Sequence, residues 1–295
     1  MSDKNKGILF IIISSFSFAC MSLFVQLSGD LPFIQKTFFR NIVALVFSFG
    51  IIIKNKTGFK FKKDNLGFLV ARASFGTLGM LLNFYAIENL ILSDATMLNK
   101  ISPFFVIIFS FLILKESIQL WQVGCIFIAF LGCLFIINPN LILFFVTGVK
   151  PEVSLNSIPA LAGLLGAMSA GLAYTMIRLL TTRGENGSFI VFFFSLFSTL
   201  FTLPFFILYH HKMELIQVVY LLLAGLFASF GQFSITAAYA HAPAKEISVF
   251  DYSQIIFSAI LGYIAFGQVP ILTSFIGYSI IISVAIFMFL KNNKK

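Results

Sequence analysis

The sequence predicts an all-α membrane protein with ten transmembrane helices, arranged as two inverted five-helix repeats. Three observations lead to this prediction. The composition is extremely apolar, the apolar residues fall into ten segments of about twenty residues, and a short motif recurs at equivalent places in the two halves of the chain.

The composition excludes a soluble globular fold. Of the 295 residues, 59% are hydrophobic and only 11% are charged, whereas soluble domains carry about a quarter charged residues. The mean hydropathy is +0.99, so there is too little polar surface to cover a globule in water. The net charge of +9 indicates no nucleic-acid partner, because the basic residues lie mostly in short loops, where they orient a chain in the membrane.

The apolar segments have the length that a hydrocarbon core of ~30 Å requires. The first one is too long for the core of a signal peptide, so we count it as a span. The longest connection, 138–157, is the predicted linker between a first repeat, 1–137, and a second repeat, 158–295. The predicted spans are 7–27, 32–53, 66–87, 91–114, 119–137, 158–182, 188–208, 216–239, 245–266 and 270–290.

The basic residues predict the orientation. Ten spans place both chain ends on one side, and a cytoplasmic N-terminus puts thirteen basic loop residues inside and two outside, as the positive-inside rule favours. The predicted location is the cell membrane, specifically a bacterial inner membrane. The inside residues are Lys4, Lys6, Lys54, Lys56, Lys60, Lys62, Lys63, Lys115, Arg183, Lys245, Lys291, Lys294 and Lys295. The outside residues are Lys150 and Lys212.

An internal repeat relates the two halves. The tetrapeptide ASFG occurs at 73–76 in the third span and at 228–231 in the eighth, and Tyr85 and Tyr239 follow at similar distances. LKES at 114–117 then falls opposite FGQV at 266–269. Five spans is an odd number, so the second copy is inverted, which is typical of secondary transporters that alternate access around a midplane site.

Four segments carry a family resemblance: FFRN at 38–41, NFYAIENLILSDATMLNKISPFF at 83–105, LKE at 114–116 and AHAPAKEISVFDY at 240–252. Over nearly its whole length the chain resembles the drug/metabolite transporter superfamily, in its ten-helix form built from two EamA domains. The resemblance implies antiparallel repeats, a central cavity, cytoplasmic termini and transport of small metabolites. One departure is Gln268, which follows Gly267 where such repeats commonly have Glu, so Glu116 has no acidic mate in the second half.

Charged residues inside the spans mark the candidate site. Lys100 lies ~10 Å into the fourth span and Arg40 ~12 Å into the second, at 1.5 Å per helical residue. An unpaired charge near mid-bilayer costs roughly 3 kcal/mol, so both side chains are expected to face an interior cavity. The alignment of the repeats places Asn99 opposite Asp251 and Lys100 opposite Tyr252, whereas Arg40 falls opposite Phe194 or close to it and breaks the symmetry.

Two interpretations of this charge cluster stay open. In the first, Arg40 and Lys100 bind a substrate carboxylate, and Asp251 pairs with a substrate amine or takes a coupling proton. In the second, Asp251 forms a structural ion pair with Lys100 or Arg40. An excess cation remains in both cases.

Other polar residues within the spans have weaker assignments. Asn83, Tyr85, Tyr174 and Gln232 either line the cavity or form interhelical hydrogen bonds. Pro103 is expected to interrupt the fourth span just after Lys100.

Several further residues are expected to play no part in the site. Arg72 and Arg178 are interpreted as anchors at the membrane interface, and Glu88 and Asp94 as solvated charges near span ends. The small residues Gly163, Ala167 and Gly171 are expected to form a packing stripe on the sixth span. The cysteines, with no metal-ligand spacing, are expected to be buried apolar residues, and no metal or cofactor is predicted; they are Cys20, Cys125 and Cys133.

The predicted function is secondary active transport of a small organic metabolite: an organic anion, an amino acid or an amino-acid derivative. The expected partners are this solute, the lipid bilayer and a coupling proton. The alternative is an exporter of aromatic or lipophilic compounds held by Phe and Tyr walls. A membrane enzyme or a channel is less favoured, because the sequence has no HExxH, GxSxG or phosphate-binding motif and no repeated filter segment.

Overall fold

The computed structural model describes residues 3–56, 58–115, 117–137, 157–241 and 248–293. Within these ranges the secondary structure is helical and contains no strand. Nine of the described helical segments are long and apolar enough to span a membrane when the interrupted segment Leu92–Leu114 is counted as one, and a shorter apolar helix covers Phe250–Phe266. The chain is therefore an all-α membrane protein. Residues 138–156 of the predicted linker, Glu116 and the first residues of the predicted ninth span, 245–247, lie outside the described ranges, whereas the last linker residue, Ser157, already begins a helix.

Each half of the chain supplies one set of spans in the order predicted. The helices of the first half are α1 (Asp3–Leu27), α2 (Phe33–Lys54), α3 (Leu66–Asn89), α4 (Leu92–Asn99), α5 (Ser102–Leu114) and α6 (Leu120–Ile137), with a 3-10 turn at Lys63–Asn65. Those of the second half are α8 (Ser157–Thr182), α9 (Gly187–Leu208), α10 (Leu215–His241), the 3-10 turn η2 (Ser248–Tyr252), α12 (Ser253–Phe266) and α13 (Leu272–Asn293).

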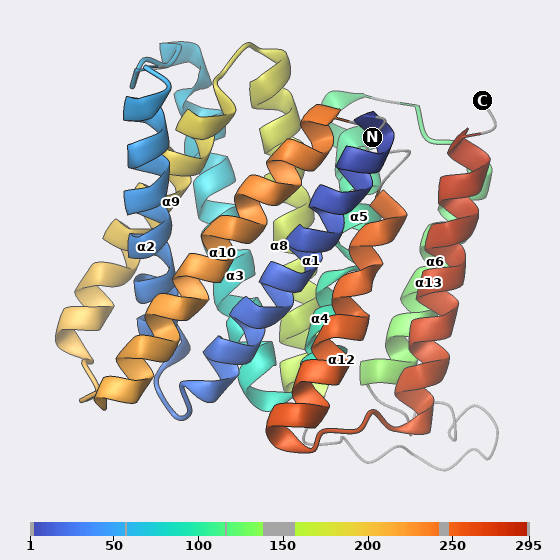
Figure 1. The fold of residues 1–295 in the computed structure, drawn as a ribbon. Helices are drawn as coiled ribbons and strands as arrows, with labels where there is room; N and C mark the ends of the chain where they lie inside the picture. Colours follow the sequence, from blue (N-terminus) through green and yellow to red (C-terminus); the bar gives the residue numbers. More distant parts are fainter. Residues whose placement is uncertain (1–2, 57, 116, 138–156, 242–247, 294–295) are drawn as a thin grey trace.

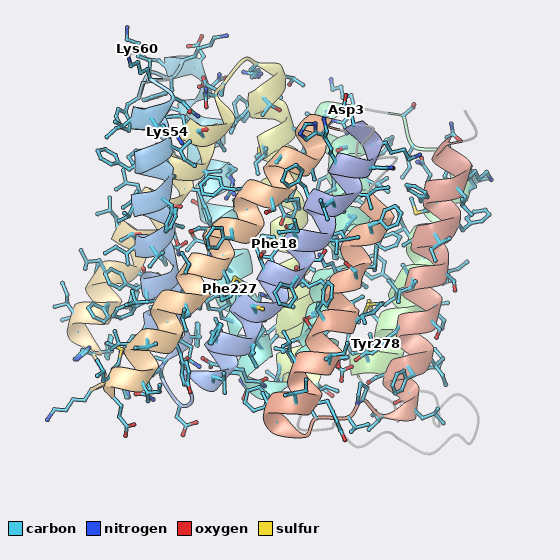
Figure 2. The ribbon with its side chains drawn as sticks, in the orientation of Figure 1. Asp3, Phe18, Lys54, Lys60, Phe227 and Tyr278 are labelled. Carbon is cyan, nitrogen blue, oxygen red and sulfur yellow. The ribbon has the colours of Figure 1, made fainter. Side chains whose placement is uncertain are left out.

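The two ends of the chain lie at the same end of the helix bundle. The beginning of α1 and the end of α13 are both at the top of Figure 1. We call this the terminal end and the opposite one the distal end. Asp3, Lys54 and Lys60 all lie at the terminal end in Figure 2. Two spans separate Asp3 from the two lysines, so the chain returns to the same end.

The helix contacts follow a pseudo-twofold pattern. The first helix of each repeat packs along the third helix of the other, so α1 lies against α10 and α8 lies against α3. The second helices, α2 and α9, pack against each other, and so do the fifth spans, α6 and α13 (Figure 1). This matching of contacts is what two inverted repeats produce.

Small residues allow the closest helix contacts. A Cβ atom on Gly166 of α8 would lie 3.1 Å from the backbone oxygen of Gly79 on α3, and one on Gly79 would lie 3.0 Å from that of Gly166. On the predicted stripe, a Cβ atom on Gly171 would lie 3.0 Å from the backbone oxygen of Ser102 at the start of α5. The stripe therefore has the packing role that was predicted. At the equivalent α1–α10 crossing, Phe18 fills the space beside Gly231, and Phe227 lies nearby (Figure 2).

Positive φ angles support the alignment of the repeats. Gly29 ends the α1 turn at φ 68°, and Gly184 ends the α8 turn at φ 87°. Their separation, 184 − 29 = 155, equals the separation of the two ASFG motifs, 228 − 73 = 155. Further along, Lys115 after α5 and Gly267 after α12 adopt φ 57° and 65°, and these two positions are the ones that LKES and FGQV place opposite each other.

Candidate functional site

Lys100 and Asp251 form an ion pair in the middle of the bundle. Lys100 Nζ lies 2.5 Å from Asp251 Oδ2, and Lys100 is 8% exposed. Ser15 on α1 donates a hydrogen bond to Asp251 Oδ1 over 3.0 Å. The carboxylate is thus held from two helices, and the ion pair of the second interpretation is present.

The fourth span is interrupted where the sequence predicted. Helix α4 ends at Asn99, α5 begins at Ser102, and Pro103 lies in the first turn of α5. Proline has no N–H and its ring collides with the carbonyl four residues earlier, so the helix cannot continue through Lys100. The break exposes the backbone carbonyl of Lys100, which accepts a hydrogen bond from Tyr252 Oη over 3.2 Å.

The break in the fourth span meets its equivalent in the ninth. Tyr252 is the last residue of η2 and directly precedes α12. Since Lys100 and Tyr252 are equivalent positions of the two repeats, their contact lies near the pseudo-twofold axis. The Tyr252 side chain therefore contacts the backbone at the break of the first repeat, and the Lys100 side chain contacts the Asp251 carboxylate of the second.

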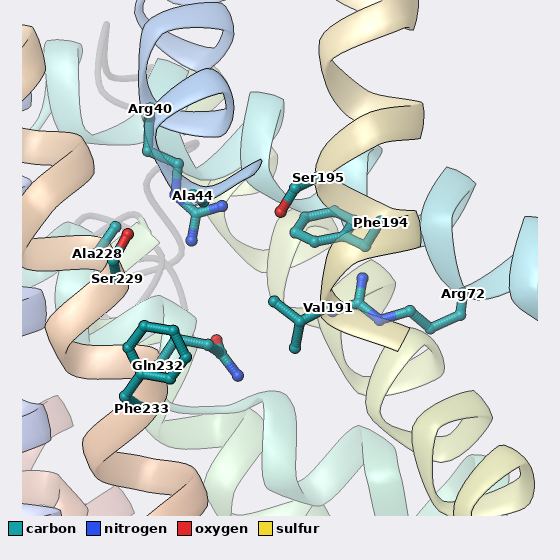
Figure 3. Close-up of a pocket in the computed structure, with 10 residues that line it drawn as sticks. All are labelled: Arg40, Ala44, Arg72, Val191, Phe194, Ser195, Ala228, Ser229, Gln232 and Phe233. Atoms are coloured by element: carbon teal, nitrogen blue, oxygen red, sulfur yellow. The ribbon is translucent and has the colours of Figure 1, made fainter. Parts of the chain in front are cut away.

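A pocket lies between α2, α3, α9 and α10. Figure 3 shows Arg40 entering it from α2 and Arg72 from α3, with Phe194 and Ser195 of α9 between them and Gln232 of α10 opposite. Ala44, Val191, Ala228 and Phe233 contribute apolar surface to the pocket.

Among the described residues, Arg40 has a hydrogen-bond partner at one nitrogen, Nη1. Its Nη1 donates to Asn41 Oδ1 over 2.9 Å, and Asn41 in turn donates to Ser198 Oγ over 2.7 Å. Arg40 Nε and Ser195 Oγ are buried and have no hydrogen-bond partner among the described residues. Buried donors are nearly always satisfied in proteins, so these atoms indicate a place for water or a ligand.

Arg72 lines the pocket, and its interpretation as an interface anchor was wrong. The residue is 6% exposed, and its guanidinium carbon lies 4.0 Å from the centre of the Phe194 ring. Its Nε and Nη1 have no hydrogen-bond partner in the described part of the chain. Gly76, one turn further along α3, makes room for the guanidinium, because a Cβ atom there would collide with Nη1. The available signal was that Arg72 is the only charged residue between Leu66 and Ile87.

Tyr174 connects the pocket with the ion pair. It lies within electrostatic range of Arg40, Arg72 and Asp251, yet 51% of the residue is exposed. On α8 it points away from the exposed residues Leu161, Leu165 and Met168, which lie on the opposite helix face. A half-exposed ring among three charged side chains indicates space that water can enter inside the bundle.

The remaining candidates lie in different surroundings. Gln232 lines the pocket, and Asn99 is the last residue of α4, directly before the break. Asn83 lies in the contact between α3 and α8, where its Oδ1 is buried without a described partner. The Tyr85 ring packs edge-on against Phe33 with 5.9 Å between ring centres. Neither Asn83 nor Tyr85 lines the pocket.

The distal end contains an ion pair that the sequence did not reveal. Lys36 is completely buried, and its Nζ lies 2.7 Å from Glu88 Oε1 and 2.7 Å from the backbone oxygen of Gly29. Gln26 on α1 donates to the backbone oxygens of Ile87 and Leu90 at 3.1 and 3.2 Å. These contacts tie α1, α2 and α3 together at this end.

Two further expectations at the distal end need correction or explanation. Glu88 is not a solvated charge, because it pairs with Lys36, and Asp94 is largely buried and accepts a hydrogen bond from Tyr278 Oη. Gln268 Oε1 accepts from the backbone N–H of Leu92 over 2.9 Å. An amide oxygen can satisfy this first N–H of α4, which explains how glutamine serves at a position where an acid was expected.

Comparison with known proteins decides the family. A model of the EamA-like transporter family matches residues 5–138 and again residues 157–290. The chain belongs to the EamA-like transporter family. The resemblance seen in the sequence is thereby confirmed, and so is the fold of two five-helix repeats.

Relatives with known names are also transporters. The chain is 30% identical over 270 residues to the pseudopaline exporter CntI of Pseudomonas aeruginosa, covering 90% of this chain and 89% of CntI. It is 27% identical over 273 residues to solute carrier family 35 member G1 of Mus musculus, covering 90% of this chain and 73% of that protein. A solved crystal structure superimposes with a TM-score of 0.65 at 13% identity over 96% of both chains, a likeness that concerns the fold alone.

These findings establish the broad function. The protein is a multi-pass membrane transporter of small molecules, and the prediction that it is not an enzyme is confirmed by its family. Among the described residues there is no group of three His, Cys, Asp or Glu side chains that could hold a metal ion.

Proposed function

We propose that this protein is a secondary active transporter of small organic anions, and that Arg40 and Arg72 form its anion-binding site. The supporting observation is the charge balance of the pocket. The Asp251 carboxylate interacts electrostatically with Tyr174, but it is already paired with Lys100. The groups that interact electrostatically with Arg72 are Tyr174 and Arg40, and neither is a carboxylate. A bound carboxylate would supply the missing negative charge through charge-assisted hydrogen bonds.

The role of Lys100 in this proposal differs from that of the two arginines. Its ammonium group forms an ion pair with Asp251 at 2.5 Å. Lys100 therefore links the two repeats and has no uncompensated charge for the substrate. Guanidinium groups also suit carboxylates better, because they can bind both oxygens at once.

We further propose that Asp251 is the site of a coupling proton. The charged and titratable groups around it are Lys100, Tyr174 and Tyr252, with Ser15 as a hydrogen-bond donor. A proton on Asp251 would remove the attraction to Lys100 and free the contact between the two repeats. Asp251→Asn is expected to exchange substrate across a membrane but to lose accumulation driven by a pH gradient. Unchanged gradient-driven accumulation would place the proton site elsewhere.

The proposed orientation puts the terminal end in the cytoplasm of a bacterial inner membrane, supported by the lysines that cluster there. A single cysteine at Asn55 should react with an impermeant thiol reagent only after the cells are opened.

Anion transport is tested with purified protein in liposomes. Radiolabelled carboxylates should enter saturably and be exchanged for unlabelled internal substrate, because a carrier exchanges and a channel does not. A thermal-shift screen that includes aromatic and lipophilic compounds tests the alternative substrate class, since any ligand of the folded state raises its stability by mass action. Stabilisation by those compounds and by no carboxylate would refute the anion proposal.

A further inference from the structure

We propose that the substrate is a dianion with two separated carboxylates, one bound by Arg40 and the other by Arg72. This inference rests on the proposed function and narrows its substrate class. It starts from the placement of the two guanidinium groups, which approach the same pocket from two helices, α2 and α3 (Figure 3).

One carboxylate cannot neutralise both arginines. A bidentate contact uses both oxygens of a carboxylate on one guanidinium. Phe194 and Ser195 lie between Arg40 and Arg72 in the pocket, so the two groups face it from different sides (Figure 3). The arginines also repel each other electrostatically. A ligand with two negative ends removes this repulsion, whereas a monoanion leaves one cation uncompensated.

The position of Arg72 is fixed independently of any ligand. Its guanidinium stacks on Phe194 at 4.0 Å, and Gly76 leaves the space in which it lies. Stacking covers one face of the guanidinium plane but leaves its edge donors available. Nε and Nη1 are buried and without a described partner; a second carboxylate bound at the edge formed by Nε and Nη2 would satisfy Nε.

In this conformation the pocket encloses about 20 Å³, room for about one water molecule, so a dicarboxylate requires the surrounding helices to move apart. Besides its polar residues, the lining includes the apolar side chains of Ala44, Val191 and Phe233. A short hydrocarbon linker between two carboxylates matches this arrangement of polar ends and an apolar centre.

A zwitterion fits the same site less well. A substrate amine needs a carboxylate partner, and Asp251 is held by Lys100 and by Ser15. Tyr174 offers only a hydroxyl. The structure therefore favours a dicarboxylate over an amino acid.

The test measures binding of three probes to the purified, full-length protein in lipid nanodiscs: glutarate with two carboxylates, butyrate with one, and 4-aminobutyrate as a zwitterion. Glutarate is expected to bind at least tenfold more tightly than the other two. In Arg72→Gln, glutarate should fall to the affinity of butyrate, and butyrate should change little. Arg72→Lys keeps a charge but cannot bind bidentately, so it should retain part of the glutarate preference.

A matched control is Arg183→Gln. Arg183 also stacks on a phenylalanine, with its guanidinium carbon 4.5 Å from the Phe68 ring centre, but it lies at the terminal end outside the pocket. It should leave all three affinities unchanged.

The outcomes separate the two proposals. Equal binding of glutarate and butyrate by the unmodified protein would overturn the dianion inference and leave anion transport standing, and this comparison needs no variant to fold. Tighter binding of 4-aminobutyrate would likewise overturn it. Absence of binding by both carboxylates would overturn the dianion inference together with the proposed function.

Discussion

Lys36 and Glu88 join α2 to α3 at the distal end through an ion pair of 2.7 Å, in which the lysine is completely buried and the glutamate side chain is 20% exposed. With the hydrogen bonds from Gln26, this pair ties α1, α2 and α3 together at the distal end. If transport follows the proposed alternating access, we expect this pair to break or move when the distal end opens.

We expect Glu88→Gln to destabilise the fold more than Lys36→Met. Glu88→Gln leaves a buried ammonium without its counter-charge, which costs about 3 kcal/mol or more. Lys36→Met leaves a carboxylate that can still reach water. Thermal unfolding in detergent measures the difference, with the exposed Lys54→Met as control. Equal losses for the two variants would mean that the pair contributes through packing alone.

The Lys100–Asp251 pair should behave as a coupled unit. Removing one partner strands a charge inside the bundle and is expected to cost about 3–5 kcal/mol of stability. The double variant Lys100→Met with Asp251→Leu removes both charges and should recover most of that loss. A double-mutant cycle on the melting temperature gives the coupling, and additive losses would contradict the pairing.

Gly76 should matter for ligand binding more than for folding. Alanine there would displace the Arg72 guanidinium, the movable end of a long side chain, and we expect weaker binding of the carboxylate that Arg72 holds. Gly67→Ala on the same helix is the control, because a Cβ atom there meets nothing within 4 Å. Both variants gain helix propensity of up to about 1 kcal/mol. Titration with glutarate distinguishes them, and equal affinities would show that Arg72 does not bind the probe.

Tyr252→Phe should lower stability by about 1–3 kcal/mol, because the Lys100 carbonyl at the helix break loses its donor. Tyr263→Phe, at a residue 63% exposed on α12, should change the melting temperature little. Equal effects of the two substitutions on thermal unfolding would exclude a structural role for the Tyr252 hydroxyl.

Most of the fold could be predicted from the sequence, since length and hydropathy mark each span and the ASFG motif marks the repeat. The break at Lys100 followed from Pro103. The site was predicted less completely. Arg72 lies about nine ångströms from the beginning of α3 by helical rise, a depth at which an interface anchor and a cavity residue have the same sequence signature. The partner of Glu88 lies 52 residues away on another helix, so only the packing of α2 on α3 could reveal it.

The pseudo-twofold contact pattern has a consequence for the direction of transport. If the two repeats had identical sequences, the states open to the two sides of the membrane would be related by symmetry and would have equal free energies. The charged residues break this equality, because Lys36, Arg40 and Arg72 all belong to the first repeat. At the 155-residue offset of the two halves, their equivalents are uncharged: Val191, Ser195 and Phe227. Under the proposed alternating access, we expect these charges to set the resting conformation of the empty carrier, and an exchange of these residues between the halves to invert it.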